Sequence, residues 1–319
     1  FTPVRVRVYT PDGGFTDSYT VQNVDGAKYI NLPSLKEKSL AWLSYSVENP
    51  VNEPALSQFF SIPMTAAADF NEPVSRFSFA VLSPPELPVR LLAPAETAVR
   101  ESAAGGVTVR SFDIAGVPSI ARESYLGHRL GVLPFYSFST MTDLGDLAAW
   151  YRGQLRGCFD ADGEFCRARF TGSGRDLVAK VYDFVAREID HRGNYLYYPA
   201  KASDILYRKR GTSEEKVILA KAILDRLGVL SFIALARGFD FPEPGDFVSP
   251  DIFTDILLYV PLSSERGIWL DFSGTEFGCG TVSGDLDGTD AMVVLSDGYE
   301  MKRVEGGGDG AVKSRYVVR

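Results

Sequence analysis

The stretch Asp204-Ile-Leu-Tyr-Arg-Lys-Arg-Gly-Thr-Ser-Glu-Glu-Lys216 runs directly into the apolar segment Val217–Val229, and this junction decides the fold. Within it, Thr212-Ser-Glu-Glu215 has the form of a capping box. In such a box a threonine and a glutamate three residues later satisfy each other's backbone amides at a helix start. We therefore expect a helix over Ser213–Leu227, with Thr212 as its N-cap.

This expected helix is apolar on nearly all sides, which is typical of a helix in the interior of a domain. Its polar side chains form a narrow edge made of Glu214, Lys221 and Asp225. An amphipathic helix precedes it, from about Gly174 to Ile189, with Ser173 as the expected N-cap. Strands are expected after it at Leu230–Ala236, Asp255–Val260, Gly267–Asp271 and Met292–Leu295. Helices followed by strands predict an α+β domain with an antiparallel sheet.

Two cysteines flank a Gly/Asp-rich turn in the segment 157–173, which we expect to be a loop or hairpin. Cys158 and Cys166 would close a small disulfide there in an oxidising compartment, and two unpaired thiols are the alternative. Cys279 lies alone between two glycines. With two histidines in the whole chain, these scattered cysteines do not supply the four clustered ligands of a structural zinc site.

The N-terminal 120 residues have the pattern of β structure. Valines alternate with arginines from Val4 to Val8, and frequent prolines leave no room for long helices. Further strands are expected at Leu40–Val47, Phe77–Leu82 and Val107–Phe112. Short strands at this spacing predict a β-sandwich.

Bulk properties exclude several classes of function. A chain of 319 residues predicts two domains. The net charge of −8 and the pI near 5.0 argue against a nucleic-acid partner. No apolar run approaches the roughly 20 residues of a membrane-spanning helix. Because the first residue is Phe1 and not Met, we expect a processed or excised fragment. The expected location of the protein is the periplasm or the outside of the cell.

The order of three blocks resembles the bacterial transglutaminase-like (papain-fold) core. The blocks are the helix start at Thr212–Ser213, the segment Phe253–Val260 and the segment Trp269–Ser273. Members of that family carry Cys, His and Asp in these blocks, and the resemblance places Ser213, Asp255 and Asp271 at the corresponding positions. The N-terminal half resembles the β-rich domain of unknown function that precedes this core in many bacterial proteins.

The resemblance implies a specific division of the chain. A β-sandwich domain that lacks its first strands would cover residues 1–135, and a transglutaminase-like α+β domain would cover residues 136–305. Residues 306–319 would be a linker and the start of an absent C-terminal domain. The predicted fold class is therefore α+β, with a β-sandwich followed by a papain-like domain.

The three triad positions predict a loss of catalysis. A serine hydroxyl depends on a base more strongly than a thiol, and a solvated carboxylate such as Asp255 has a pKa near 4 and is a poor base. His128 lies between the two domains, and His191 follows a helix at an exposed exit, so neither occupies the base position. The capping box explains Thr212–Glu215 without any chemistry. We expect a non-catalytic pseudoenzyme that binds or scaffolds a peptide, glycan or protein partner.

Two alternatives stay open. One is a hydrolase or acyltransferase that acts on amide bonds through Ser213 or through the pair Asp255 and Asp271. The other is a weak Ca²⁺ or Mg²⁺ site at the same two aspartates, helped by Glu214 or Ser213; otherwise no cofactor is expected. The residues expected to contact a partner are Thr212, Tyr197, Phe253 and Trp269, although core packing explains the aromatic ones equally well.

Overall fold

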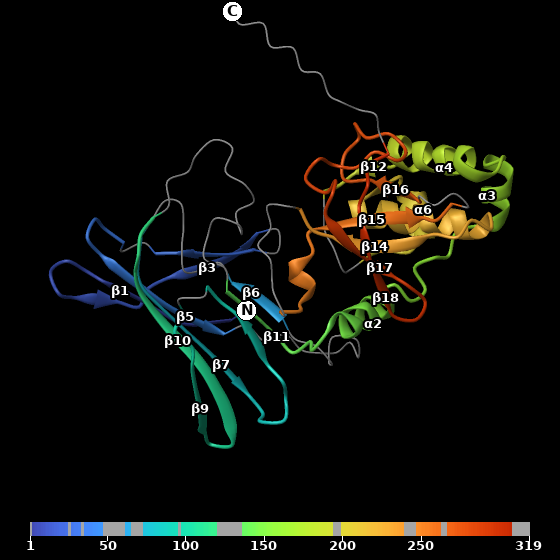
Figure 1. The fold of residues 1–319 in the computed structure, drawn as a ribbon. Coiled ribbons are helices and arrows are strands. Elements are labelled where there is room, and N and C mark those ends of the chain that lie inside the picture. The colour runs from blue at the N-terminus through green and yellow to red at the C-terminus, as the bar shows by residue number, and fades with distance from the viewer. Residues whose placement is uncertain are drawn as a thin grey trace, which may run out of the picture. The chain divides into compact units, whose positions relative to one another are not determined.

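The computed structural model describes residues 2–24, 27–32, 35–46, 61–64, 73–94, 97–119, 136–193, 199–238, 247–262 and 267–307. They belong to two compact units, Phe1–Pro54 and Ala55–Arg319 (Figure 1). The predicted division near residue 135 stays a prediction. Most of the predicted linker and domain start at residues 306–319 lies outside the described residues. No helix among the described residues has the length and hydropathy needed to cross a bilayer.

The first unit consists of short antiparallel strands. Its three-stranded sheet has the order β2-β1-β5, and a separate hairpin pairs β3 with β4. The strands are β1 (Thr2–Tyr9), β2 (Phe15–Thr16), β3 (Thr20–Val24), β4 (Ala27–Asn31) and β5 (Leu40–Ser46). The alternation in β1 has the expected consequence, because Val6 and Val8 are buried while Arg7 forms an ion pair with Asp17.

The second unit begins with two three-stranded antiparallel sheets. Their orders are β7-β10-β9 and β6-β11-β8. The strands are β6 (Ser61–Met64), β7 (Val74–Ser83), β8 (Arg90–Leu92), β9 (Arg100–Ala104), β10 (Val107–Val117) and β11 (Tyr136–Ser139). Phe79 of β7 packs against Phe112 of β10 and Phe138 of β11, with ring centroids 5.3 and 6.1 Å apart. The predicted β structure is confirmed, whereas a single sandwich over residues 1–135 stays a prediction.

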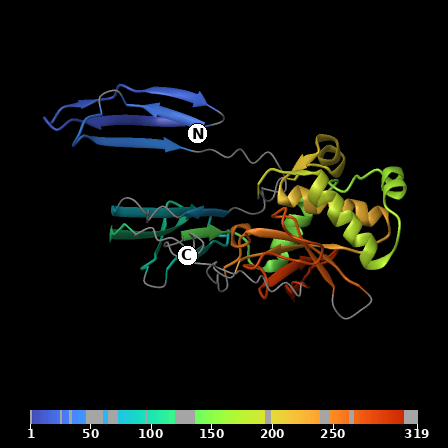
Figure 2. The ribbon, with the colours of Figure 1, turned by 90° about the horizontal axis from the view of Figure 1, so that it is seen from above.

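The remainder of the second unit contains helices that pack around a central one, α6 (Ser213–Arg226). The other helices are α2 (Leu144–Gln154), α3 (Gly163–Arg169), α4 (Gly174–Glu188) and α5 (Ala202–Arg208). Helices α3, α4 and α5 pack against α6, and Figure 2 shows α4 (yellow-green) and α6 (gold) on the same side of the orange strands. The two helices predicted from periodicity are confirmed within one residue at their C-terminal ends.

The expected loop or hairpin at 157–173 is wrong, because α3 lies inside it. The side chain of Asp162 accepts hydrogen bonds from the backbone amides of Glu164 and Phe165 and so caps α3. The Asp-Gly signal interpreted as a turn is therefore a helix start. A helix of seven residues is too short to show a clear apolar period.

A five-stranded antiparallel sheet completes the second unit, with the order β16-β15-β14-β17-β18. Its strands are β14 (Phe232–Ala236), β15 (Asp255–Val260), β16 (Ile268–Asp271), β17 (Asp290–Val294) and β18 (Tyr299–Arg303). A 3₁₀ turn, η1 (Pro250–Ile252), precedes β15. The four predicted strands are confirmed, and β18 was missed because its side chains are mostly exposed and charged.

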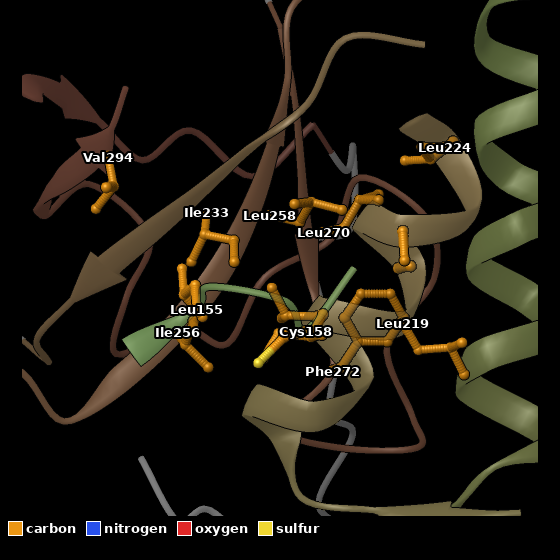
Figure 3. Packing of buried hydrophobic residues seen from close by; sticks show 14 of the residues in the cluster. Leu155, Cys158, Leu219, Leu224, Ile233, Ile256, Leu258, Leu270, Phe272 and Val294 are labelled. Carbon is orange, nitrogen blue, oxygen red and sulfur yellow. The ribbon is translucent and has the colours of Figure 1, made fainter. Parts of the chain in front are cut away.

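Alternate residues of the sheet enter two different cores. Ile256, Leu258 and Leu270 pack beneath α6 against residues such as Leu219, as Figure 3 shows. Leu257 and Trp269, which lie between them in sequence, belong to a second cluster on the opposite face. This separation follows from the period of two along a strand.

The polar edge predicted for α6 is wrong at Glu214. This side chain is only 2% exposed, and its carboxylate accepts a hydrogen bond of 2.7 Å from Tyr151 Oη. Lys216 is also buried; it donates to Ala186 O at 3.4 Å, and burial lowers the pKa of its amine. Because α6 is enclosed on more sides than its sequence indicates, these polar groups have partners inside the protein.

Leu219→Ala should lower the free energy of unfolding by about 2–5 kcal/mol, because the side chain is fully buried and the substitution leaves a cavity. Leu230→Ala is the matched control. Leu230 is 61% exposed, so its truncation should change stability by less than about 0.5 kcal/mol. Urea unfolding followed by circular dichroism measures both, and similar losses in the two variants would contradict the assignment of α6 to the core.

Candidate functional site

The start of α6, where the resemblance places the nucleophile position, is built as a complete cap. Thr212 Oγ1 accepts a hydrogen bond of 3.2 Å from Glu215 N, and Thr212 N donates to Glu215 Oε2 at 3.0 Å. The predicted capping box is therefore confirmed. Ser213 follows it at 3% exposure, and its backbone amide donates to Gly193 O at 3.1 Å. The hydroxyl of Thr212, expected to contact a partner, is engaged in the cap.

His191 lies closer to the nucleophile position than its sequence context predicts. It belongs to β12 (Asp190–His191), which pairs in parallel with β13 (Arg210–Gly211) directly before α6. The expected exposed helix exit is wrong, since His191 is half-buried and pairs with Gly211. No hydrogen bond joins its ring to Ser213 Oγ in the described part of the chain. His128 lies outside the described residues.

Asp271 is fully buried at the end of β16. Its carboxylate accepts hydrogen bonds from the backbone amides of Ser273 at 2.8 Å and Ser283 at 2.9 Å. Burial raises the pKa of the Asp271 carboxyl, and these hydrogen bonds oppose the rise. Both oxygens thus hold the loop that follows β16.

Asp255 is half-buried at the start of β15, and its Oδ2 accepts a hydrogen bond of 2.6 Å from Thr254 Oγ1. Leu257 faces Asp271 in the sheet register, so Asp255 and Asp271 are diagonal neighbours on one face. The backbones at diagonal positions lie about 7–8 Å apart. The carboxylate that adds to the rise in the pKa of Asp271 is Asp285.

The described residues offer little support for a metal at these aspartates. Among them, no group of three or more His, Cys, Asp and Glu side chains is arranged to hold an ion. Glu214, which was expected to help Asp255 and Asp271, has its carboxylate hydrogen-bonded to Tyr151 instead. The chemistry of Ca²⁺ asks for six or more oxygen ligands.

The three aromatic residues expected to contact a partner have different surroundings. Phe253 is buried in the core beneath α6, which agrees with the core-packing alternative. Trp269 is 3% exposed, packs at 4.8 Å on the ring of Tyr259, and borders a cavity of about 540 Å³. Tyr197 lies outside the described residues.

The cysteines are unpaired, so the second of the two alternatives holds. Cys158 follows α2 and Cys166 lies within α3, both buried, and burial raises the pKa of each thiol. Burial also raises the pKa of Cys279 to about 11. A thiol with a raised pKa is a weak nucleophile at neutral pH.

Comparison with solved structures identifies the fold. A putative protease from Parabacteroides distasonis superposes on this chain with a TM-score of 0.72 at 12% sequence identity, over 95% of this chain and 61% of the other. A putative cysteine protease from Cytophaga hutchinsonii matches with a TM-score of 0.33 and 12% identity, over 68% of this chain and 72% of the other. The chain matches no protein-family model and no curated protein.

The first of these similarities shows a common fold. The fold is mixed α+β, with a β-rich N-terminal part and with helices and an antiparallel sheet after it, as predicted. This chain spans about three fifths of the length of the Parabacteroides protein. The second similarity is too low in TM-score to carry an argument. Fold alone does not establish activity.

Thr212→Ala should lower the free energy of unfolding by about 1 kcal/mol, because it removes the side-chain half of the capping box. Thr171→Ala is a suitable control, since Thr171 is exposed and its side chain caps no helix. Thermal unfolding measures both. Equal melting temperatures for Thr212→Ala and the unsubstituted chain would contradict a stabilising role for the cap.

Asp271→Asn should change how stability depends on pH. The folded pKa of Asp271 is raised, so the carboxyl favours the folded state below its unfolded pKa, and this contribution is lost as the pH rises through the folded value. The Asn side chain does not ionise, so its contribution to the free energy of unfolding stays constant with pH. The difference in the free energy of unfolding between Asp271→Asn and the unsubstituted chain should therefore shift in favour of the variant as the pH rises from 4 to 8. Urea unfolding across this range tests it, and parallel pH profiles would refute it.

Proposed function

We propose that this chain is a non-catalytic member of the transglutaminase-like, papain-fold proteins. In this proposal it acts outside the cytoplasm as a binding or scaffolding module for a peptide, glycan or protein partner. The similarity in fold to a putative protease supports the scaffold. The residues at the three triad positions, Ser213, Asp255 and Asp271, support the absence of catalysis.

The observation that carries the proposal is the structural use of the helix start. A nucleophile there needs an exposed side chain and a base that takes its proton. Ser213 instead is nearly inaccessible beside a complete capping box. The residue that would orient an imidazole, Asp271, has both carboxylate oxygens hydrogen-bonded to backbone amides. These groups have structural roles that require no substrate.

One observation favours a second candidate, a hydrolase that acts on amide bonds through Ser213. The pairing of β12 with β13 places His191 opposite Gly211, and Ser213 N donates to Gly193 O just beyond this pair. The backbone of His191 is therefore near that of Ser213. A rotation of the imidazole on substrate binding would supply the base that the family position lacks.

A fluorophosphonate probe, which labels activated serines, separates the two functions. We expect the folded chain to be labelled no more than Ser213→Ala, because Ser213 is nearly inaccessible and has no base among the described residues. Labelling that is lost both in Ser213→Ala and in His191→Gln would establish the serine hydrolase and overturn the proposal.

Controls make this result interpretable. Labelling of the urea-unfolded chain gives the non-specific background, and Ser173→Ala tests a serine at another helix start. The fluorophosphonate probe does not detect a mechanism through the carboxylates. Hydrolysis of fluorescent casein is therefore measured for the unsubstituted chain and for Asp255→Asn. Turnover that disappears in Asp255→Asn would also contradict a non-catalytic role.

A further inference from the structure

The five-stranded sheet curls so strongly that residues of its two edges border one cavity. β16 and β18 are the outermost strands in sheet order, yet Lys302 Nζ of β18 lies 5.4 Å from the ring centroid of Tyr259 beside β16. A hydrogen bond of 2.7 Å from Gly307 N to Gly280 O joins the segments that follow the two edges. The cavity of about 540 Å³ has a size typical of ligand sites.

Backbone groups of both edges point away from the sheet at this cavity. Val304 N donates to Thr289 O, so the backbone N–H and C=O of Val304 point toward the chain that leads into β17. Along a strand these groups point alternately to one neighbour and to the other. Every second residue of β18, counted back from Val304, therefore bonds to β17. The N–H and C=O of Met301 and Arg303 then point away from β17, to the open side of β18. The same alternation, followed through the paired residues of β17, β14 and β15, makes the N–H and C=O of Trp269 point to the open side of β16. Among the described residues these three have no backbone partner on that side. The cavity is therefore bordered by groups that can extend a sheet.

An independent contact supports this alternation. Asp271 lies two residues after Trp269, so its C=O should also point outward. Tyr182 of α4, which lies outside the sheet, donates its hydroxyl proton to that carbonyl at 3.0 Å. Burial raises the pKa of the Tyr182 phenol, so it remains a donor at neutral pH.

Arg175 of α4 supplies a cation to the same cavity. Within the described ranges it forms no ion pair. The other two cations of the lining already have acidic neighbours, because Lys302 Nζ lies 2.6 Å from Glu300 and Arg303 lies 3.9 Å from Asp290. A guanidinium without an acidic neighbour binds a carboxylate through two parallel hydrogen bonds. The lining carries three cations, Arg175, Lys302 and Arg303, against two carboxylates, Glu300 and Glu305, so its charge favours an acidic ligand.

We propose that this cavity binds the C-terminal end of a short extended peptide, whose terminal carboxylate pairs with Arg175 and whose backbone hydrogen-bonds to the open edges at Trp269 and Met301. Extended peptides add to open sheet edges in this way, and alternate side chains give them specificity. The half-buried side chain of Leu262 would contact the peptide. The site lies along the sheet edges formed by β16 and β18, and it deepens the proposed function by naming a peptide as the partner.

The test is calorimetric titration of the full chain with acetylated tripeptides of the form acetyl-Ala-Xaa-Ala. Each is supplied with a free terminal carboxylate and as the C-terminal amide. We expect the best acid to bind at least tenfold more tightly than its amide. Arg175→Gln should remove this preference. Arg187→Gln should leave it unchanged, because Arg187 lies on the same helix but pairs with Asp183.

A second pair of variants tests the backbone contact. Met301→Pro removes only an outward N–H, which an edge strand tolerates, whereas Met301→Ala keeps it. The proline variant should weaken binding of acid and amide alike by roughly fivefold to tenfold, the loss expected for one hydrogen bond. The alanine variant should retain binding within about twofold. Melting temperatures confirm that each variant folds.

Three results would overturn the inference: no tripeptide acid binds, acid and amide bind equally, or Met301→Pro binds as well as Met301→Ala. The last result would mean that Arg175 attracts carboxylates without strand addition. None of these results depends on Ser213. Failure of this inference can therefore be distinguished from failure of the proposed function, which the serine probe measures separately.

Discussion

The structure of the second unit depends on satisfying backbone amides at the buried start of α6. The first amides of a helix have no partner within the helix, and burial makes an unsatisfied amide costly. Glu215 meets this requirement by accepting from Thr212 N, and it also accepts from Ala200 N and Arg208 Nη2. One carboxylate therefore ties α6 to the two segments before it. Ser213 lies inside this arrangement, which explains why its surroundings are complete without a substrate.

The sheet imposes a second constraint, because its two faces serve different purposes. The face under α6 is filled by large apolar side chains. The opposite face closes on itself through strand curvature, and the loop held by Asp271 covers part of it. Curvature also brings Arg175 and Lys302 to one cavity, although 127 positions separate them in the sequence. Strand alternation thus links a structural carboxylate to the proposed peptide site.

Much of this fold could be predicted from local patterns. The capping box located the start of α6 correctly, and the apolar period of α4 and the alternation in four strands gave their positions. The misses have physical causes. The helix α3 is too short for a period, and β18 is an exposed charged edge without an apolar face. At the candidate site, His191 was misplaced because the pairing of β12 with β13 is a long-range contact.

The sequence by itself determined the elements whose information is local: helix starts, apolar stripes and alternating strands. Only the tertiary structure decided which polar groups are buried and which charges meet. Glu214 has the sequence pattern of a surface residue but is enclosed beside Tyr151, and the cavity at Trp269 requires two sheet edges to approach each other. The physical reason is that burial and electrostatic environment depend on neighbours supplied by distant parts of the chain, which no local period records.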